Sequence, residues 1–234
     1  MSTRDIVQDI VKHTAGLGFI TNVKVTGTDE ATELDAMDAD RTVIMHAQLH
    51  NATPDFKGEF GLGNLGFLAG VTSLGNYQTD DATVEVVSRE RNGVTTPDHL
   101  MFKDADGNTD QYRFMSKEII EQTLQTVKFK GADWDVTFEP TKAKVSELTQ
   151  VAGIYGGIEP NFTVKTQDGD LIVTVGAPDG SFTGKRTFAS NIAGELNEGY
   201  AWPLAQVLAI LKLGMSGACV MQISSRGALQ ISVD

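Results

Sequence analysis

The sequence predicts an α+β protein built from two units of similar element order, each with two helices packed on mostly antiparallel sheet. The chain has 234 residues, a length that suits two domains of roughly 115 residues each. Most strand-like segments are short and alternate apolar with polar residues, as expected for antiparallel sheet with one wet face. A succession of helix, strands, helix and strands recurs in each half of the chain, as a repeat of element order rather than of letters.

The first half opens with a helix predicted over residues 4–15, where apolar side chains recur at helical spacing and Ser2 or Thr3 supplies the N-cap. A second helix over 64–75 is expected to begin at Asn64 and to end at Gly75. Its inward face has a period near 3.5, with Leu65, Leu68, Val71 and Leu74. Strands are predicted before it at 21–27, 32–37, 42–49 and 55–60, and after it at 82–90, 98–106 and 109–116.

The second half repeats this order after a charged connector. Residues 1–115 are assigned to the first domain, 116–133 to the connector and 134–234 to the second domain. Helices are predicted over 141–156 and 203–214, the latter with Pro203 in its first turn. Strands are predicted at 134–140, 161–176 (a hairpin), 180–190, 194–202 and 217–234 (a terminal hairpin).

Composition bounds the class of protein. Hydrophobic residues make up 41% and charged residues 21% of the chain, which is ordinary for a globular protein. Neither a signal peptide nor an apolar stretch of membrane-spanning length is recognisable, so a cytoplasmic protein is expected, in the host cytoplasm if the source is viral. The single cysteine, Cys219, is expected to be a buried core residue. A net charge of −12 disfavours nucleic acid by the simplest argument, but it does not say where the basic residues point.

The segment "GLGNLGFLAG" contains Gly61, Gly63 and Gly66 in the spacing of a dinucleotide-binding loop. Such a loop should follow a buried parallel strand, whereas the preceding "DFKGEF" alternates and has one wet face. The acidic residues Asp80 and Asp81 also precede the next strand, where the motif requires an acid at its end. The glycines therefore indicate a tight strand-to-helix turn and a helix close to a sheet, and no cofactor is expected.

Other candidates for chemistry also fail on spacing. "DADGNTD" at 104–110 resembles a calcium loop, but its glycine and its twelfth residue are wrong, so a hairpin turn is favoured. His46 and His50 lie four apart on or beside a strand, where the distance of about 13 Å is too long for one metal ion. No nucleophile motif, P-loop or metal cluster is recognisable. Neither a catalytic residue, nor a metal site, nor enzymatic activity is therefore predicted.

Several segments together resemble the sliding clamps of DNA polymerases. "LDAMDADRTVIMHAQLHN" resembles the strand-turn-strand segment of these clamps, and "FGLGNLGFLAGVTSLGN" resembles the segment that leads into the domain's second helix. The second half, "KVSELTQVAGIYG" with "FTVKTQDGDLIVTVG", is similar to the clamp order of helix, strand, acidic hairpin and strand, and "SSRGALQISVD" resembles the last strand. Length and domain count point to the T-even bacteriophage type.

The resemblance implies a ring of two-helix clamp domains, closed by six domains and hence by three chains. Helices would line the hole, and the ring would tether the replicative DNA polymerase to duplex DNA after a separate loader has opened it. Sequence-independent contact with phosphate needs only a modest set of basic residues on the helices, although any solvated helix also carries such residues. The candidates for facing DNA are Arg4, Lys12, Lys142, Lys144 and Lys212.

The resemblance also implies a groove for partner peptides beside the connector. The candidate groove residues are Met37, Val43, Leu124, Val127 and Val233. Two other classes of function stay open at this point. One is a dinucleotide-binding enzyme that uses the loop from Gly61 to Gly66, and the other is a β-rich structural or virion protein.

Overall fold

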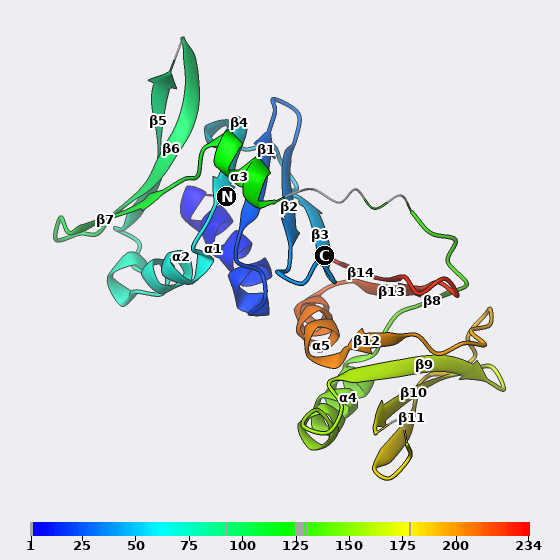
Figure 1. Ribbon diagram of the computed structural model, residues 1–234. Helices are drawn as coiled ribbons and strands as arrows, with labels where there is room; N and C mark the ends of the chain where they lie inside the picture. Colours follow the sequence, from blue (N-terminus) through cyan, green and yellow to red (C-terminus); the bar gives the residue numbers. More distant parts are fainter. Residues whose placement is uncertain (1, 92, 125–128, 130, 178) are drawn as a thin grey trace. The chain divides into compact units, whose positions relative to one another are not determined.

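A computed structural model of the chain describes residues 2–91, 93–124, 129, 131–177 and 179–234 (Figure 1). The chain divides into two units, Met1–Phe129 and Lys130–Asp234. Each unit buries its own set of apolar side chains. Within the described ranges, no helix combines the length and the apolar character needed to cross a membrane.

Unit 1 contains two helices that lie side by side and a short third helix at its end. The helices are α1 (Thr3–His13), α2 (Leu65–Thr72) and α3 (Lys117–Thr123), with short 3-10 turns η1 (Ala15–Leu17), η2 (Pro54–Phe56) and η3 (Gly75–Tyr77). Its strands are β1 (Val23–Gly27), β2 (Thr32–Met37), β3 (Ile44–Gln48), β4 (Gly58–Leu62), β5 (Thr83–Arg91), β6 (Val94–Lys103) and β7 (Thr109–Arg113).

Two antiparallel sheets form the rest of unit 1, in the orders β3-β2-β1-β4 and β5-β6-β7. The alternation that predicted the strands also sets their faces. In β1 the side chains of Val23 and Val25 are buried, while Lys24 lies on the opposite face. The register pairs Val25 with Phe60 of β4, and both belong to the core that α1 and α2 cover. A capping box starts α1, since Ser2 Oγ accepts from the Asp5 amide and Asp5 Oδ2 accepts from the Ser2 amide.

Unit 2 repeats this plan. Its helices are α4 (Lys142–Tyr155) and α5 (Leu204–Leu213), with the 3-10 turn η4 (Gly214–Ser216). Its strands are β8 (Val136–Phe138), β9 (Asn161–Gln167), β10 (Asp170–Gly176), β11 (Thr183–Ala189), β12 (Ala201–Pro203), β13 (Cys219–Ile223) and β14 (Leu229–Val233). The sheet order β11-β10-β9-β12 matches β3-β2-β1-β4 of unit 1 strand for strand, and β14-β13-β8 forms the second sheet. The predicted α+β class with antiparallel sheets and two main helices per unit is thus confirmed.

Several local expectations were wrong. The first helix ends at His13, and the strand expected over 55–60 is instead the 3-10 turn η2 followed by β4. Leu74 lies beyond the end of α2 and is exposed, because the helix stops at Thr72. The strand expected over 194–202 is confined to its last residues, since β12 begins at Ala201 and the preceding glycine-rich and acidic stretch is mostly exposed. Pro203 ends β12 and precedes the first residue of α5, so it caps that helix rather than opening its first turn.

Candidate functional site

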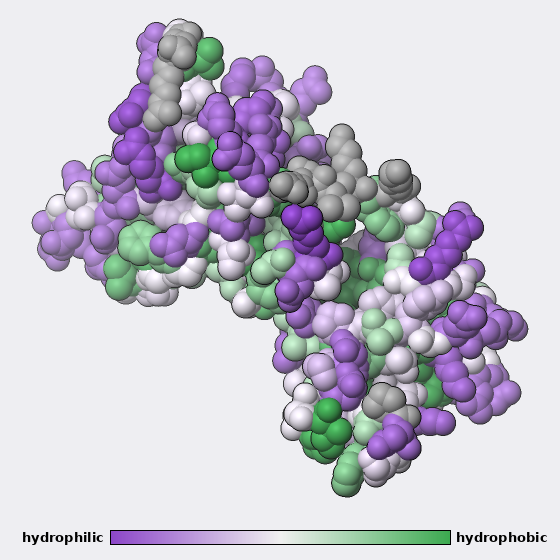
Figure 2. Space-filling view, in the orientation of Figure 1, coloured by the Kyte–Doolittle hydropathy of each residue, from purple (hydrophilic) through white to green (hydrophobic). Residues whose placement is uncertain are grey.

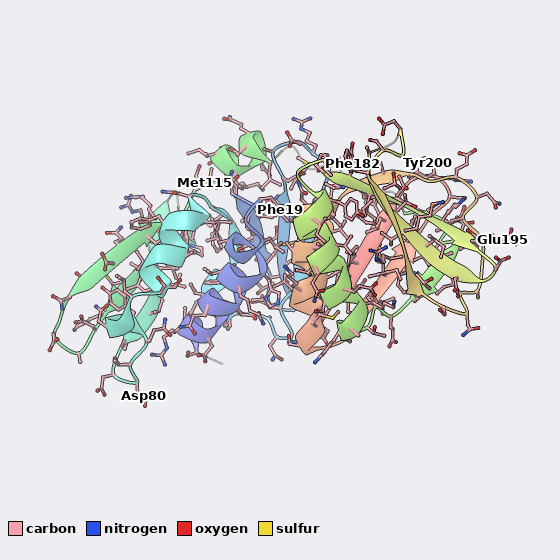
Figure 3. The ribbon with its side chains drawn as sticks, turned by 90° about the horizontal axis from the view of Figure 1, so that it is seen from below. Phe19, Asp80, Met115, Phe182, Glu195 and Tyr200 are labelled. Carbon is pink, nitrogen blue, oxygen red and sulfur yellow. The ribbon has the colours of Figure 1, made fainter. Side chains whose placement is uncertain are left out.

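The helix pairs of the two units present the basic residues that the sequence marked. In unit 1, α1 packs against α2, and in unit 2, α4 packs against α5 (Figure 3). The four helices together carry five Lys and Arg residues and only three Asp and Glu residues. Because the chain as a whole has a net charge of −12, its negative charge is concentrated outside these helices. Taken together, the main helices therefore repel phosphate less than the rest of the chain does on average.

The two basic candidates of unit 1 differ in whether their side chains are held by other residues. Arg4 donates from Nη1 to the carbonyl of Thr79, so its guanidinium ties α1 to the loop after η3. Lys12 is exposed near the end of α1 and makes no ion pair with any described residue. The neighbouring Asp9 and His13 contact each other instead, with Nδ1 and Oδ1 3.2 Å apart. Lys12 is thus the freer cation on this helix.

In unit 2, Lys142 and Lys212 are exposed and, within the described part of the chain, unpaired. Lys144 is held differently, because its Nζ donates to Glu147 Oε2 at 2.9 Å. Arg186 of β11 approaches the other oxygen of the same carboxylate, with Nε and Oε1 3.7 Å apart. Lys144 therefore has part of its charge balanced within the protein, unlike Lys142 and Lys212.

The glycine motif has a packing role that differs from the expected turn. Gly61 lies in β4, and a Cβ built on it would come within 2.7 Å of the Ile120 side chain of α3. At Gly63 a Cβ would meet Met115 Sδ at 2.5 Å. Main-chain hydrogen bonds join Gly61 and Met115 in both directions, at 3.0 and 2.8 Å. Because Gly61 and Gly63 have no side chains, Ile120 and Met115 can pack directly against their main chain.

The remaining expectations for this motif were wrong in detail. Gly66 and Gly70 face open space, so no close helix–sheet contact requires them. The left-handed conformation that the strand-to-helix turn needs is adopted by Asn64, with φ of 53°, and not by a glycine of the motif. Asn64 does occupy the N-cap position, but its side chain makes no capping hydrogen bond. Its carbonyl accepts from the Phe67 amide, which begins the helical pattern.

A charged network fixes α3 on the outer face of the first sheet. Glu59 of β4 contacts both Lys24 of β1, at 3.0 Å, and Lys117 of α3, at 2.8 Å. The hydrogen bond from Lys117, and next the one from Lys24, lowers the pKa of Glu59. The bond to Glu59 in turn raises the pKa of Lys117. Beneath this network Ile120 is fully buried. The connector therefore begins with a helix that is anchored to unit 1 by apolar and ionic contacts.

The predicted groove residues fall on both units. Met37 ends β2 and pairs in register with Ile44, which is exposed on the same outer face. Val43 precedes β3, and its amide donates to Asp38 Oδ1 at 2.8 Å. Leu124 is buried at the end of α3, where its amide bonds to the Ile120 carbonyl. Val233 lies in β14 of unit 2, while Val127 is outside the described residues.

Sequence reasoning did not single out Ile44 as a groove residue. The pattern of β3 contained the signal, because Met45, Ala47 and Leu49 are the half-buried side chains that pack against the core. The alternate residues Ile44 and His46 must then lie on the outer face, next to Met37 and Asp35 of β2. His46 Nδ1 contacts Asp35 Oδ1 at 2.8 Å, so this face combines apolar and polar side chains.

The features that imitated metal sites have structural roles. Asp104 accepts a hydrogen bond from the Asn108 main-chain amide at 2.8 Å, which closes the turn between β6 and β7, and one from the Asn76 side chain at 2.8 Å, which joins η3 to this turn. Gly107 supplies the positive φ of 85° in this turn. Within the ranges that the structure describes, no group of three or more His, Cys, Asp or Glu side chains is arranged to hold a metal ion.

Comparison with solved structures decides the fold. The whole chain superposes on the Helicobacter pylori beta clamp, solved with 5-chloroisatin, with a TM-score of 0.66 at 12% identity. This chain has the sliding-clamp fold. It spans 60% of the length of that beta clamp, so the match covers only part of the bacterial chain.

Two archaeal clamp structures agree over nearly their full length. The PCNA2–PCNA3 complex of Sulfolobus tokodaii matches with a TM-score of 0.65 at 11% identity, covering 99% of this chain and 91% of the other. PCNA of Thermococcus kodakaraensis matches with a TM-score of 0.63 at 12% identity, covering 99% and 95%. No protein-family model matches the sequence, and no curated protein matches it either. The clamp fold is therefore recognisable from the backbone structure and not from sequence similarity.

Proposed function

We propose that this protein is a sliding clamp, a non-enzymatic ring that encircles duplex DNA and tethers the replicative polymerase. The observation that carries the proposal is the match of the entire chain, through both units, to clamp structures. The two units per chain suit a homotrimer of the T-even bacteriophage type, with a separate loader that opens the ring. Dinucleotide binding has no support, because Ile120 and Met115 pack directly against Gly61 and Gly63.

The charge distribution supports DNA as the encircled partner. Lys12, Lys142 and Lys212 are exposed on the main helices and are not neutralised by any described side chain. A thin layer of unpaired cations attracts phosphate without fixing the register on the duplex, which is what a sliding contact requires. Arg4 and Lys144 lie on the same helices as these lysines, but the Thr79 carbonyl holds the Arg4 guanidinium in place and Glu147 balances part of the Lys144 charge.

Exposed apolar side chains beside sheet edges support assembly into a ring. In unit 1, exposed Phe67 of α2 stacks on Tyr112 of the edge strand β7, with ring centroids 6.4 Å apart. In unit 2, Ile154 of α4 and Phe182, next to the edge strand β11, are both exposed. Figure 2 shows a small hydrophobic spot at the position of α4, among less hydrophobic residues. Pairing of these two different surfaces between chains is head-to-tail, and such an interface closes a ring when the rotation fits.

The outer face of unit 1 supports a site for partner peptides. Met37 and Ile44 form an apolar patch on β2 and β3, and α3 is anchored on the same face of this sheet, over β1 and β4. An apolar anchor of a partner peptide would bury Ile44, with Val43 beside it in the preceding turn, while a contribution from Leu124, which follows α3, stays a prediction. The contributions expected from Val127 and Val233 stay predictions.

Polymerase processivity on primed circular DNA, with the cognate loader and ATP, tests the proposal. The wild-type protein should lengthen the products, and linearising the template should release the protein because a ring slides off an open end. The triple variant Lys12→Glu, Lys142→Glu, Lys212→Glu should keep its oligomeric mass but lose retention on DNA. A protein that oligomerises without any stimulation would instead fit a structural or virion protein and would contradict the clamp.

A further inference from the structure

The second sheet of unit 1 carries a cluster of charged side chains that the clamp function does not use. It consists of Arg89 on β5, Asp98 and His99 on β6, and Arg113 on β7. Arg113 Nη2 donates to Asp98 Oδ1 at 3.1 Å, and Arg89 Nε lies 3.6 Å from the same oxygen. The other carboxylate oxygen accepts from His99 Nδ1 at 3.0 Å.

A β-bulge builds this cluster. The register pairs Val87 with His99 and Ser88 with Pro97, so Asp98 is an extra residue on β6 with no partner on β5. Bulges of this kind re-aim a side chain. His99 pairs in register with Arg113, and Leu100 pairs with Tyr112. Because side chains alternate along a strand, His99 and Arg113 point away from the core that holds Leu100 and Tyr112.

The two guanidinium groups have donors to spare. The side chain of Asp98 is only 9% exposed, while those of Arg89 and Arg113 are 52% and 53% exposed. One carboxylate oxygen thus holds two arginines that both reach solvent, and one negative charge cannot balance two positive ones. Each guanidinium has five N–H donors in a planar fork suited to carboxylate. In a chain with a net charge of −12, this local excess of positive charge is a feature that attracts an anion.

We propose that Arg89 and Arg113 form a docking site for an acidic peptide segment of a partner protein, with Asp98 as the residue that positions both. The side chains of this site are on the face of the sheet opposite the core, whereas α1 packs on the core side. Encircled duplex, which the main helices would face, is therefore not the ligand that this geometry favours. The carboxylates of the peptide would take the free N–H donors of the two guanidinium groups. Further along the same face, the exposed Lys103 and Glu85 carry opposite charges, so Arg89, Arg113 and Asp98 set the local balance.

Fluorescence anisotropy of a labelled hexaglutamate peptide at low salt tests this site. The double variant Arg89→Ala, Arg113→Ala should weaken binding by about tenfold or more, because both forks are removed. The matched control Lys165→Ala, Lys185→Ala removes the same charge from exposed positions of unit 2 and should change the affinity less than about twofold. Equal weakening in both variants, or no binding to the wild type, would overturn the proposal.

Two further measurements distinguish recognition by the planar guanidinium groups from simple charge attraction and from nucleic-acid binding. Arg89→Lys, Arg113→Lys keeps the charge but loses the planar fork, so its affinity should fall between those of the wild type and the alanine variant; affinity equal to that of the wild type would exclude recognition by the fork. A labelled duplex should bind the wild type and the alanine variant alike. If duplex binding is lost with the peptide, the patch is a nucleic-acid site and the proposal is wrong. The native mass of each variant is a separate readout, so failure here leaves the ring untouched.

Discussion

The two units share one connectivity but differ in what covers their sheets. In unit 1, β4 is five residues long, and Gly61 within it leaves room for Ile120 of α3. The matching strand of unit 2, β12, is three residues long and follows an exposed stretch over 190–200. The helices differ as well, since α2 carries no charged residue while α4 and α5 carry three lysines. The fold thus requires only the core alternation and the strand order, and the residues that differ mark each unit's separate task.

The largest effect should come from the residue that anchors α3 in unit 1. Ile120 is 0% exposed and its neighbour Ile119 is 52% exposed, which makes them a matched pair on one helix. Ile120→Ala should lower the free energy of unfolding of unit 1 by about 2–4 kcal/mol, because it leaves a cavity over Gly61. Ile119→Ala should change it by less than about 0.5 kcal/mol. Urea unfolding, monitored in each unit by hydrogen exchange, measures both changes. Equal effects would show that α3 does not pack on the sheet through Ile120.

A second pair of substitutions should have opposite signs. Gly61→Ala places a methyl group against Ile120 and should destabilise unit 1 by about 1–3 kcal/mol. Gly66→Ala adds a methyl group in open space on α2 and should stabilise it by about 0.5–1 kcal/mol, because glycine is a poor helix former. Thermal unfolding of the two variants gives the signs directly. If Gly61→Ala stabilises unit 1, Ile120 does not pack closely against Gly61 as described.

The contrast in helix charge should appear in the salt dependence of DNA binding. Lys142→Glu, Lys212→Glu in unit 2 should reduce the slope of log affinity against log salt by about 2 or more, and Lys12→Glu in unit 1 by about 1. The matched control is Lys165→Glu, on a strand away from the helices, which should leave the slope unchanged. If the control lowers the slope as much as Lys142 and Lys212 do, the attraction comes from overall charge and not from the helix layer.

The smallest effect should be a difference in acid sensitivity. The hydrogen bond from His99, followed by the charges of Arg113 and Arg89, lowers the pKa of Asp98 below its ordinary 3.8. A carboxyl whose pKa is lowered by folding stabilises the folded state above its unfolded pKa and loses that contribution as pH falls through its lowered pKa. Unit 1 should therefore lose stability below about pH 4, and Asp98→Asn should make that decline shallower. Urea midpoints between neutral and acid pH test this, and parallel curves for the two proteins would contradict it.

The sequence predicted most of the fold because the fold depends on local patterns. Alternation in β1 and helical spacing in α1 each agree with the buried faces that the structure has. The strand expected over 194–202 failed because Leu196 is one buried side chain in an otherwise exposed loop, which imitates a strand pattern. The end of α2 failed because Leu74 continues the apolar period after the helix has stopped.

The candidate site was less accessible to sequence reasoning, since it depends on contacts between distant residues. The spelling around Gly61 indicated close packing, but only the fold shows that the partner is Ile120, far along the chain. The pairing of Lys144 with Glu147 could be anticipated from helical spacing, whereas the approach of Arg186 could not. The bulge that aims Asp98 at two arginines is a matter of strand register, and no local pattern reveals it.

The native mass of the purified protein tests the central claim most directly. Native mass spectrometry, checked by light scattering at several concentrations, should find a closed particle of three 25.2 kDa chains. Substituting Phe182 and Ile154 by Asp should shift that particle to single chains while each unit stays folded, because both side chains are exposed in the separate chain. A wild-type protein that remains a single chain at every concentration, or that forms an open series of larger species, would contradict the ring.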